Sequence, residues 1–336
     1  MKDLGQKEGA IRLLTEAMKI DKNNRLTILS HECKREVASH ALSAANDLAM
    51  KDIIFVEIPE IIRPLKHLPR PLLGAMDQSD GLVYFASRMQ EEAYTFNDPL
   101  LSRCKEKNLT LCYLYDPQIR YFEEGIAADY ETVQGKCSKV AKILAESEEI
   151  QVESDLGTSL TFSVYKKVLP RGPVISPEMR QIQAPEGEVM SVPVETSFNG
   201  KLVVDHTVTK AGIPPSPVAW TFHKGQATKV EGDELFLSNL LNSLKGSDER
   251  VRSLKGIWIA EFALGTNDWC VLDDNISNCE KVAGTLHFGM GQEENKIGVD
   301  RGERYHFDSM VTNAAVTVKG KDGTKRLITE KGRLLI

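Results

Sequence analysis

The stretch Arg25–Ile58, with the sequence RLTILSHECKREVASHALSAANDLAMKDIIFVEI, decides the fold of the first half of this chain. Its two ends, residues 25–30 and 52–58, are short and apolar, as the buried strands of parallel sheets tend to be. The Ala-rich segment 35–50 between them is typical of a helix. A strand, a helix and a second strand in this order predict a mostly parallel sheet that is covered by helices.

The same alternation continues on both sides of this stretch. Residues 7–20 carry apolar side chains at helical spacing, and residues 129–147 form another helical segment. Two further short apolar segments, 81–87 and 109–115, predict two more buried strands. We therefore expect the α/β fold class, with a Rossmann-like α/β N-terminal domain over residues 1–150.

The turn after the first strand, Ser30-His31-Glu32-Cys33-Lys34, argues against a nucleotide-binding role for this domain. It lacks the G-x-G-x-x-G word of dinucleotide-binding folds, and the chain contains no Walker-type phosphate loop. His31 ends the strand, where it could face a ligand, although a single loop histidine is more often solvated. The sequence thus disfavours dinucleotide binding.

From residue 151 the pattern becomes β-rich. Residues 151–164 alternate polar and apolar side chains and turn at Gly157, which predicts an antiparallel hairpin. After a Pro-rich connection, residues 201–205, 256–262 and 314–318 predict further strands, and residues 233–244 predict a helix. We expect a second domain over residues 151–336, of α+β type, that carries the catalytic site.

Composition excludes several classes of function. The 336 residues carry 42 Lys and Arg against 48 Asp and Glu, a formal net charge of −6, so the chain has no electrostatic footprint for nucleic acid. Its N-terminus lacks a signal-peptide pattern, and no apolar run approaches the roughly 20 residues that span a bilayer. Six cysteines without C-x-x-C spacing fit reduced thiols rather than disulfides or a zinc finger. We predict a cytoplasmic protein without nucleic-acid or membrane partners.

Carboxylate and imidazole side chains of the second half form a candidate metal site. His306 and Asp308 alternate on a predicted strand, so both side chains point to the same face. Glu and Asp oxygens with His nitrogens are ligands for zinc, manganese, cobalt or ferrous iron. From spacing alone, ordinary solvated or hydrogen-bonded side chains remain an alternative. The candidate ligands are Glu188, Glu261, His287, His306 and Asp308.

Across most of its length the chain resembles the thermophilic-type metallo-aminopeptidases, the family of aminopeptidases T and S. The resemblance rests on five words that occur in the family's order. They are Gly157-Thr-Ser-Leu-Thr-Phe, Pro185-Glu-Gly-Glu-Val-Met-Ser-Val-Pro193 with Asn199-Gly200, Ala260-Glu-Phe-Ala-Leu-Gly265, Thr285-Leu-His-Phe-Gly-Met-Gly291, and Tyr305-His-Phe-Asp308.

This resemblance implies a metal-dependent hydrolase that removes N-terminal residues from small peptides. It further implies two divalent ions, zinc, cobalt or manganese, and a homodimer. By the family's motifs the ions are held by Glu188, Glu261, His287, His306 and Asp308. A metal-activated water then attacks the amide, with Glu188 and Glu261 as the catalytic carboxylates and Glu188 as ligand or general base. Glu280 or Glu303 could accept hydrogen bonds from the ligand histidines.

The chain departs from the aminopeptidase pattern in one respect. The family places a Tyr shortly after the first metal-binding His, whereas this chain has Gly291-Gln-Glu-Glu-Asn-Lys296. Tyr305 could substitute, although strand alternation points it away from His306. The missing Tyr keeps a catalytically silent metal-binding relative as an alternative.

The resemblance extends to a ring-cleaving relative, the ferrous 2,5-dihydroxypyridine dioxygenases, with a single Fe(II) in a His-His-Asp site. In those enzymes a His occupies the place of Glu261, and neither Glu188 nor His287 has a counterpart. An Fe(II) dioxygenase that opens a hydroxylated N-heterocycle is thus the second alternative. The ligand set of this chain favours the aminopeptidase-like hydrolase.

Overall fold

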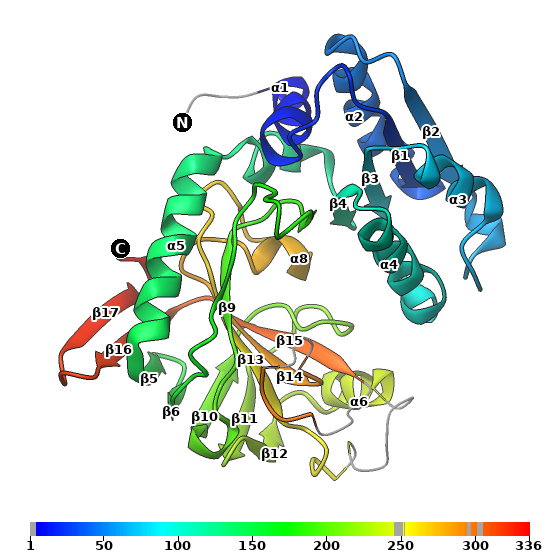
Figure 1. Ribbon diagram of the computed structural model, residues 1–336. Coiled ribbons are helices and arrows are strands. Elements are labelled where there is room, and N and C mark those ends of the chain that lie inside the picture. The colour runs from blue at the N-terminus through cyan, green and yellow to red at the C-terminus, as the bar shows by residue number, and fades with distance from the viewer. Residues whose placement is uncertain (1–4, 245–250, 252, 294–296, 301–304) are drawn as a thin grey trace. The chain divides into compact units, whose positions relative to one another are not determined.

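The computed structural model of the 336-residue chain describes residues 5–244, 251, 253–293, 297–300 and 305–336 (Figure 1). The chain forms two compact units. Unit 1 comprises Met1–Gln134 and Gly172–Glu186, and unit 2 comprises Gly135–Arg171 and Gly187–Ile336. The predicted boundary at residue 150 differs from this division, because the chain leaves unit 1 within helix α5 (Tyr130–Glu146) and returns to it at Gly172. The predicted α/β fold class is confirmed.

Unit 1 is built around a parallel five-stranded sheet in the order β2-β1-β3-β4-β8. Four of the strands lie where the sequence predicts them, and β8 is added by the segment that returns from unit 2. The strands are β1 (Leu26–His31), β2 (Ile53–Ile58), β3 (Gly81–Ala86), β4 (Thr110–Tyr115) and β8 (Gln181–Gln183). The helices are α1 (Gln6–Arg12), α2 (Arg35–Asp47), α3 (Arg70–Asp77) and α4 (Asp98–Glu106).

Helices cover both faces of this sheet because its central strands are buried on both sides (Figure 1). On one face, Leu29 and Tyr84 pack in a core cluster with Leu72 of α3 and Leu100 of α4. The buried alanines of α2 lie on its inner side, and α2 contacts α1 and strands β1 to β3. The parallel sheet therefore follows from strands that are apolar on both faces.

His31 is a buried residue of unit 1, not a solvated loop residue as its position after the predicted strand suggested. It is the last residue of β1 and is 0% exposed. Its Nε2 lies 3.0 Å from the Tyr84 hydroxyl, and its Nδ1 accepts the backbone N–H of Ser87 at 3.0 Å. Burial, with the nearby Arg63 cation, lowers the pKa of His31 to about 4.

This low pKa predicts that the stability of unit 1 falls with acidity. The unfolded chain takes up a proton on His31 below about pH 6.5, whereas the folded chain does so only near pH 4. The free energy of unfolding should therefore fall by about 2 kcal/mol between pH 7.5 and pH 5 from this group alone. Urea unfolding of the wild type and of His31→Gln at both pH values measures this fall in the free energy of unfolding. An equal fall in the two proteins would contradict the prediction.

Unit 2 contains two antiparallel sheets, which confirms its β-rich character. The eight-stranded sheet has the order β12-β11-β10-β6-β5-β16-β17-β18. Its strands are β5 (Ser147–Ser154), β6 (Ser159–Phe162), β10 (Asn199–Val204), β11 (Val218–His223), β12 (Gln226–Glu231), β16 (Ala314–Gly320), β17 (Lys325–Glu330) and β18 (Arg333–Leu334). The predicted hairpin is β5 and β6, with Gly157 at a positive φ of 99° in its turn.

The five-stranded sheet of unit 2 has the order β15-β14-β13-β9-β7. Its strands are β7 (Leu169–Arg171), β9 (Glu188–Ser191), β13 (Ile259–Gly265), β14 (Leu286–Gly291) and β15 (His306–Val311), and the unit also holds helices α6 (Glu234–Ser243) and α8 (Ile276–Cys279). Phe162 of β6 lies 5.1 Å from Phe262 of β13, ring centre to centre, and Phe262 lies 5.4 Å from Phe288 of β14. These aromatic contacts join the two sheets face to face.

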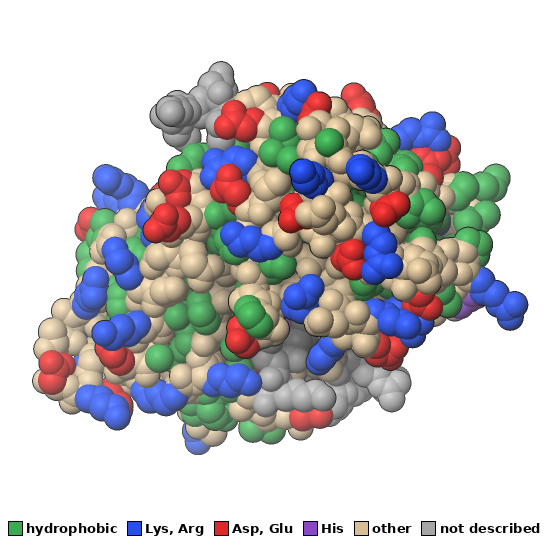
Figure 2. Space-filling model, turned by 45° about the horizontal axis from the view of Figure 1, so that its top comes forward, with side chains coloured by type: hydrophobic (Ala, Val, Ile, Leu, Met, Phe, Trp, Pro, Cys, Tyr) green, Lys and Arg blue, Asp and Glu red, His purple; other side chains and the backbone are tan. Residues whose placement is uncertain are grey.

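The surface carries both signs of charge. On the face drawn in Figure 2, Lys and Arg side chains are interspersed with Asp and Glu, and no broad field of one sign is visible. Within the described ranges, every helix is too short or too polar to cross a membrane.

Candidate metal centre

Strand register brings the five predicted ligands to one face of the five-stranded sheet. Phe262 pairs with Phe288 and points toward the eight-stranded sheet, so the residues before and after them in each strand point the other way. Across the ladder, Glu261 and Asp308 both pair with Gly289. The other three ligands follow the same register: His306 opposite Gly291, His287 opposite Ala263 and Glu188 opposite Gly265.

The side chains converge as well as share a face. His287 Nε2 lies 3.1 Å from Glu261 Oε1 and 3.6 Å from Glu188 Oε2. His306 Nε2 lies 3.0 Å from Asp308 Oδ1 and 3.8 Å from Glu261 Oε2. One ligand atom from each of Glu261, His287 and Asp308 lies within 4.8 Å of the others, which is close enough for one metal ion. We name these three residues the first ligand group.

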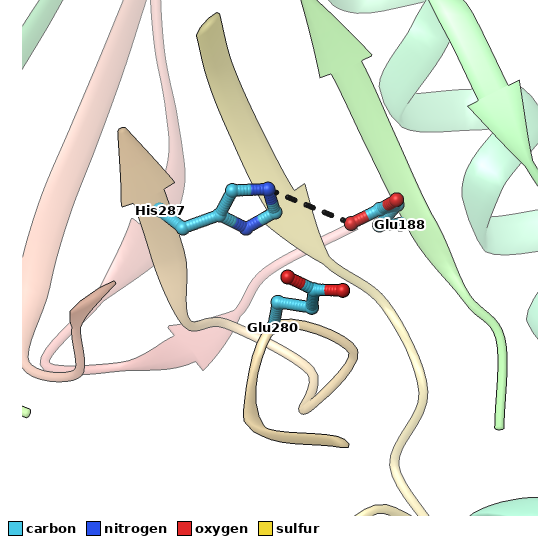
Figure 3. A group of neighbouring side chains, drawn as sticks. All are labelled: Glu188, Glu280 and His287. Atoms are coloured by element: carbon cyan, nitrogen blue, oxygen red, sulfur yellow. Dashed lines mark ion pairs between the residues drawn. The ribbon is translucent and has the colours of Figure 1, made fainter. Parts of the chain in front are cut away.

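A second ligand group consists of Glu188, Glu280 and His287, whose ligand atoms also lie within 4.8 Å of one another (Figure 3). Glu188 begins β9, His287 lies in β14, and Glu280 follows the short helix α8. The two groups share His287. The sequence suggested Glu280 only as a hydrogen-bond partner for a ligand histidine. The turn after α8 places the Glu280 carboxylate itself among the possible metal ligands.

Gly289 makes room for the first ligand group. A Cβ atom built there would lie 2.7 Å from the Glu261 Cβ and 2.7 Å from the His306 Cε1. Both distances are shorter than real side chains allow, so any larger residue displaces a ligand.

The charges of the site shift the pKa values of its members. Burial opposes ionisation of Asp308, but the imidazoles of His306 and His287 outweigh it and lower the pKa of Asp308. Burial, with the neighbouring Asp308, raises the pKa of Glu261. Burial disfavours the cation of His287, yet Glu261 and Glu188 outweigh it and raise the pKa of His287 to about 9. The site as a whole therefore attracts positive charge.

The donor set fits a divalent cation. The His306 Nδ1–H donates to the carbonyl oxygen of Gln292 at 2.8 Å, which directs Nε2 toward Asp308 and Glu261. An imidazole nitrogen between two carboxylates needs a proton or a metal ion there. Thr209 holds Asp308 in place, since its hydroxyl lies 3.2 Å from Asp308 Oδ2 and accepts the Asp308 backbone N–H at 3.1 Å.

Two buried atoms of the site lack a hydrogen-bond partner among the described residues: Glu188 Oε2 and His287 Nδ1. Buried polar atoms without partners are costly, so such atoms in a native site call for an explanation. A ligand or metal ion that binds in this space would satisfy at least one of them. The structure thus brings the five predicted residues close together, and it places Glu280 beside them.

Two basic residues that the sequence analysis did not consider lie beside Glu188. Lys281 Nζ is 2.7 Å from Glu188 Oε1, and Arg171 Nε is 3.8 Å from the same oxygen. Burial opposes ionisation of Glu188, but Lys281, His287 and Arg171 outweigh it and lower the pKa of Glu188. Nothing in the local sequence distinguishes Lys281 from a solvated lysine.

Three further residues were suggested by the sequence as partners or substitutes at the site. The Tyr305 hydroxyl donates to the carbonyl oxygen of Gly256, so Tyr305 does not replace the family's missing Tyr. Glu280, suggested as an acceptor for a ligand histidine, pairs with Lys281 and lies in the second ligand group. Glu303, the other suggested acceptor, lies outside the described residues.

Three comparisons place these observations among known proteins. The profile of the family described as "NicX: 2,5-dihydroxypyridine 5,6-dioxygenase" matches residues 126–335. No curated protein matches the sequence significantly.

Two solved structures share the fold of nearly the whole chain. Wild-type AmpT from Thermus thermophilus has a TM-score of 0.72 at 14% identity, over 98% of this chain and 99% of its own. A 2,5-dihydroxypyridine dioxygenase from Pseudomonas putida KT2440 has a TM-score of 0.66 at 15% identity, over 98% of this chain and 96% of its own. The resemblance to an aminopeptidase with a ring-cleaving dioxygenase as its neighbour is confirmed.

Proposed function

The chain belongs to the family described as NicX, 2,5-dihydroxypyridine 5,6-dioxygenase, because the profile of that family covers more than half of the chain. On this premise we propose that the protein is a metal-dependent enzyme. We propose further that it is an aminopeptidase-like hydrolase, which cleaves the N-terminal amide of small peptides. The metal would be zinc, cobalt, manganese or iron, because nitrogen and carboxylate ligands suit all of them.

One observation carries the hydrolase proposal: the carboxylate of Glu188 is buried beside the ligands, and among the residues that the structure describes its Oε2 has no hydrogen-bond partner. Amide hydrolysis needs a carboxylate of this kind, either to take a proton from the attacking water or to hold the ammonium of the peptide N-terminus. Glu188 Oε2 faces His287 at 3.6 Å and therefore borders the ligand groups.

The other residues have complementary tasks in this proposal. A divalent cation, when bound, lowers the pKa of a coordinated water and polarises a carbonyl oxygen. Glu261, His287, His306 and Asp308 would hold it, and Glu261 is the second carboxylate in reach of a transferred proton. Thr209 and the Gln292 carbonyl fix the orientation of Asp308 and His306. From the resemblance alone we also expect a homodimer.

Glu188→Gln is expected to test this role. The amide keeps the size of the side chain but cannot accept a proton, so kcat on an aminoacyl-anilide should fall by about a hundredfold or more. Glu231→Gln, on an exposed strand of the same unit, is the matched control and should retain activity. Full activity of Glu188→Gln would rule out its catalytic role.

The second candidate function is an Fe(II) dioxygenase that opens a hydroxylated N-heterocycle. The family profile favours it, and His287, His306 and Asp308 still provide two imidazoles and a carboxylate. Oxygen uptake with 2,5-dihydroxypyridine after loading with Fe(II) tests this candidate. Oxygen-dependent ring opening without anilide cleavage would favour the dioxygenase; turnover of neither substrate would favour a catalytically silent relative.

A further inference from the structure

Lys281 occupies the second ligand group. Its Nζ lies 2.7 Å from Glu188 Oε1 and 3.0 Å from Glu280 Oε1. Its side chain is 2% exposed, and Lys281 is among the largest fully buried side chains of the described chain. A lysine is rarely buried in this way unless anionic partners compensate its charge.

The backbone around Lys281 fixes this position. Helix α8 begins with a cap in which the Asn275 side chain accepts the Ser277 N–H. The Lys281 N–H donates to the Asn278 carbonyl at 3.1 Å, and the Lys281 carbonyl accepts the Asn267 N–H at 2.9 Å. Both backbone hydrogen-bonding groups of Lys281 are therefore paired, which holds its backbone in place and directs its side chain into the site.

The ammonium competes directly with a metal ion for the second ligand group. It contacts one oxygen of each carboxylate in that group, which are two of the three ligands available to an ion. A divalent ion placed among the same atoms would lie within a few ångströms of a fixed positive charge, at high electrostatic cost in a buried site.

The first ligand group is different. Among the described residues, no Lys or Arg forms an ion pair with Glu261 or Asp308, and the ion-pair partners of both are histidines. Neutral imidazoles can bind a metal ion through a lone pair, whereas an ammonium cannot. The first group can therefore accept an ion without displacing a fixed cation.

We propose that the Lys281 ammonium takes the place of a second metal ion, so that the centre holds a single divalent ion in the first ligand group. This inference rests on the proposed function, because it assumes that a metal binds here. It departs from the two ions that the aminopeptidase resemblance implies. It also explains how Glu188 keeps an oxygen free: Lys281 holds Oε1 and leaves Oε2 for a proton or a substrate ammonium.

Manganese titration of the full chain tests the proposal without any activity assay. After treatment with a chelator, the protein is titrated with Mn²⁺, and bound metal is counted by elemental analysis and electron paramagnetic resonance. We expect one ion per chain and the spectrum of an isolated Mn²⁺. Two ions of similar affinity with exchange-coupled spectra would overturn the single-ion inference and leave the metal-dependent function intact. No bound ion would overturn both.

Lys281→Met provides the positive test, because it retains the length of the side chain and removes the charge. A second Mn²⁺ should then bind at least about tenfold more tightly than to the wild type. Lys136→Met, which removes a lysine paired with Asp268 in the same unit, is the matched control and should still bind one ion. A Lys281→Met protein that folds and still binds one ion would overturn the proposal. If it does not fold, Lys281→Gln replaces it, and the wild-type stoichiometry decides in either case.

Discussion

Replacing Glu261 by Gln is expected to lower metal affinity, and with it kcat/KM, by at least about a hundredfold. Outer partners of metal ligands already contribute about 10 to 100-fold to affinity, so a ligand itself should contribute more. Glu261 contacts His287 of the first ligand group at 3.1 Å and lies 3.8 Å from His306, so it stands between the two imidazoles. The amide preserves the shape of the side chain but removes the charge that attracts the ion.

Competition with a fluorescent chelator measures the affinity of Glu261→Gln, and far-ultraviolet circular dichroism confirms that the variant is folded. Glu231→Gln, whose half-exposed carboxylate pairs with Lys229 and not with a candidate ligand, is again the control. A Glu261→Gln protein that binds metal like the wild type would mean that the ion binds elsewhere.

Replacing Glu92 by Gln is expected to destabilise unit 1 by about 3–5 kcal/mol. Arg63 and Glu92 are each 1% exposed and are joined at 2.7 Å, so the substitution removes the buried partner of the guanidinium and leaves it only the partly exposed Glu60 at 3.1 Å. Glu92 also accepts the Leu65 backbone N–H at 2.8 Å, and Arg63 donates to the Ser87 carbonyl at 2.7 Å. The pair thus ties together the loops that follow β2 and β3.

Urea unfolding at neutral pH measures this loss. Asp77→Asn, which breaks a partly exposed ion pair with Arg103, should cost less than about 1 kcal/mol. Arg63→Met combined with Glu92→Leu should recover much of the lost stability, because both buried charges are then absent. Equal effects of Glu92→Gln and Asp77→Asn would show that burial does not strengthen this pair.

Local sequence was sufficient for most secondary structure and for the shared face of two candidate ligands. The predicted strands around residues 25–30, 52–58, 81–87 and 109–115 all exist, because short apolar segments favour buried parallel strands whatever their partners. His306 and Asp308 share a face because strand side chains alternate, which depends only on the backbone.

Local sequence was insufficient wherever a contact joins distant segments. The predicted boundary at residue 150 marks a change of pattern from helix to hairpin, whereas the units are defined by long-range contacts, including the pairing of β8 with β4. His31 has the polarity of a solvated residue, but the Tyr84 hydroxyl and the Ser87 backbone N–H, 53 and 56 positions away, satisfy its two ring nitrogens in the interior.

What the sequence by itself determined is the α/β character and the β-rich second half, since both follow from composition and from the period of helices and strands, while the family resemblance pointed to the five candidate ligands. What only the tertiary structure decided is the charge balance of that site. Lys281 lies 93 positions from Glu188 in the chain but 2.7 Å from it in space. Whether a lysine is a solvated cation or a buried one in place of a metal ion depends on the carboxylates that surround it, and the fold alone brings those together.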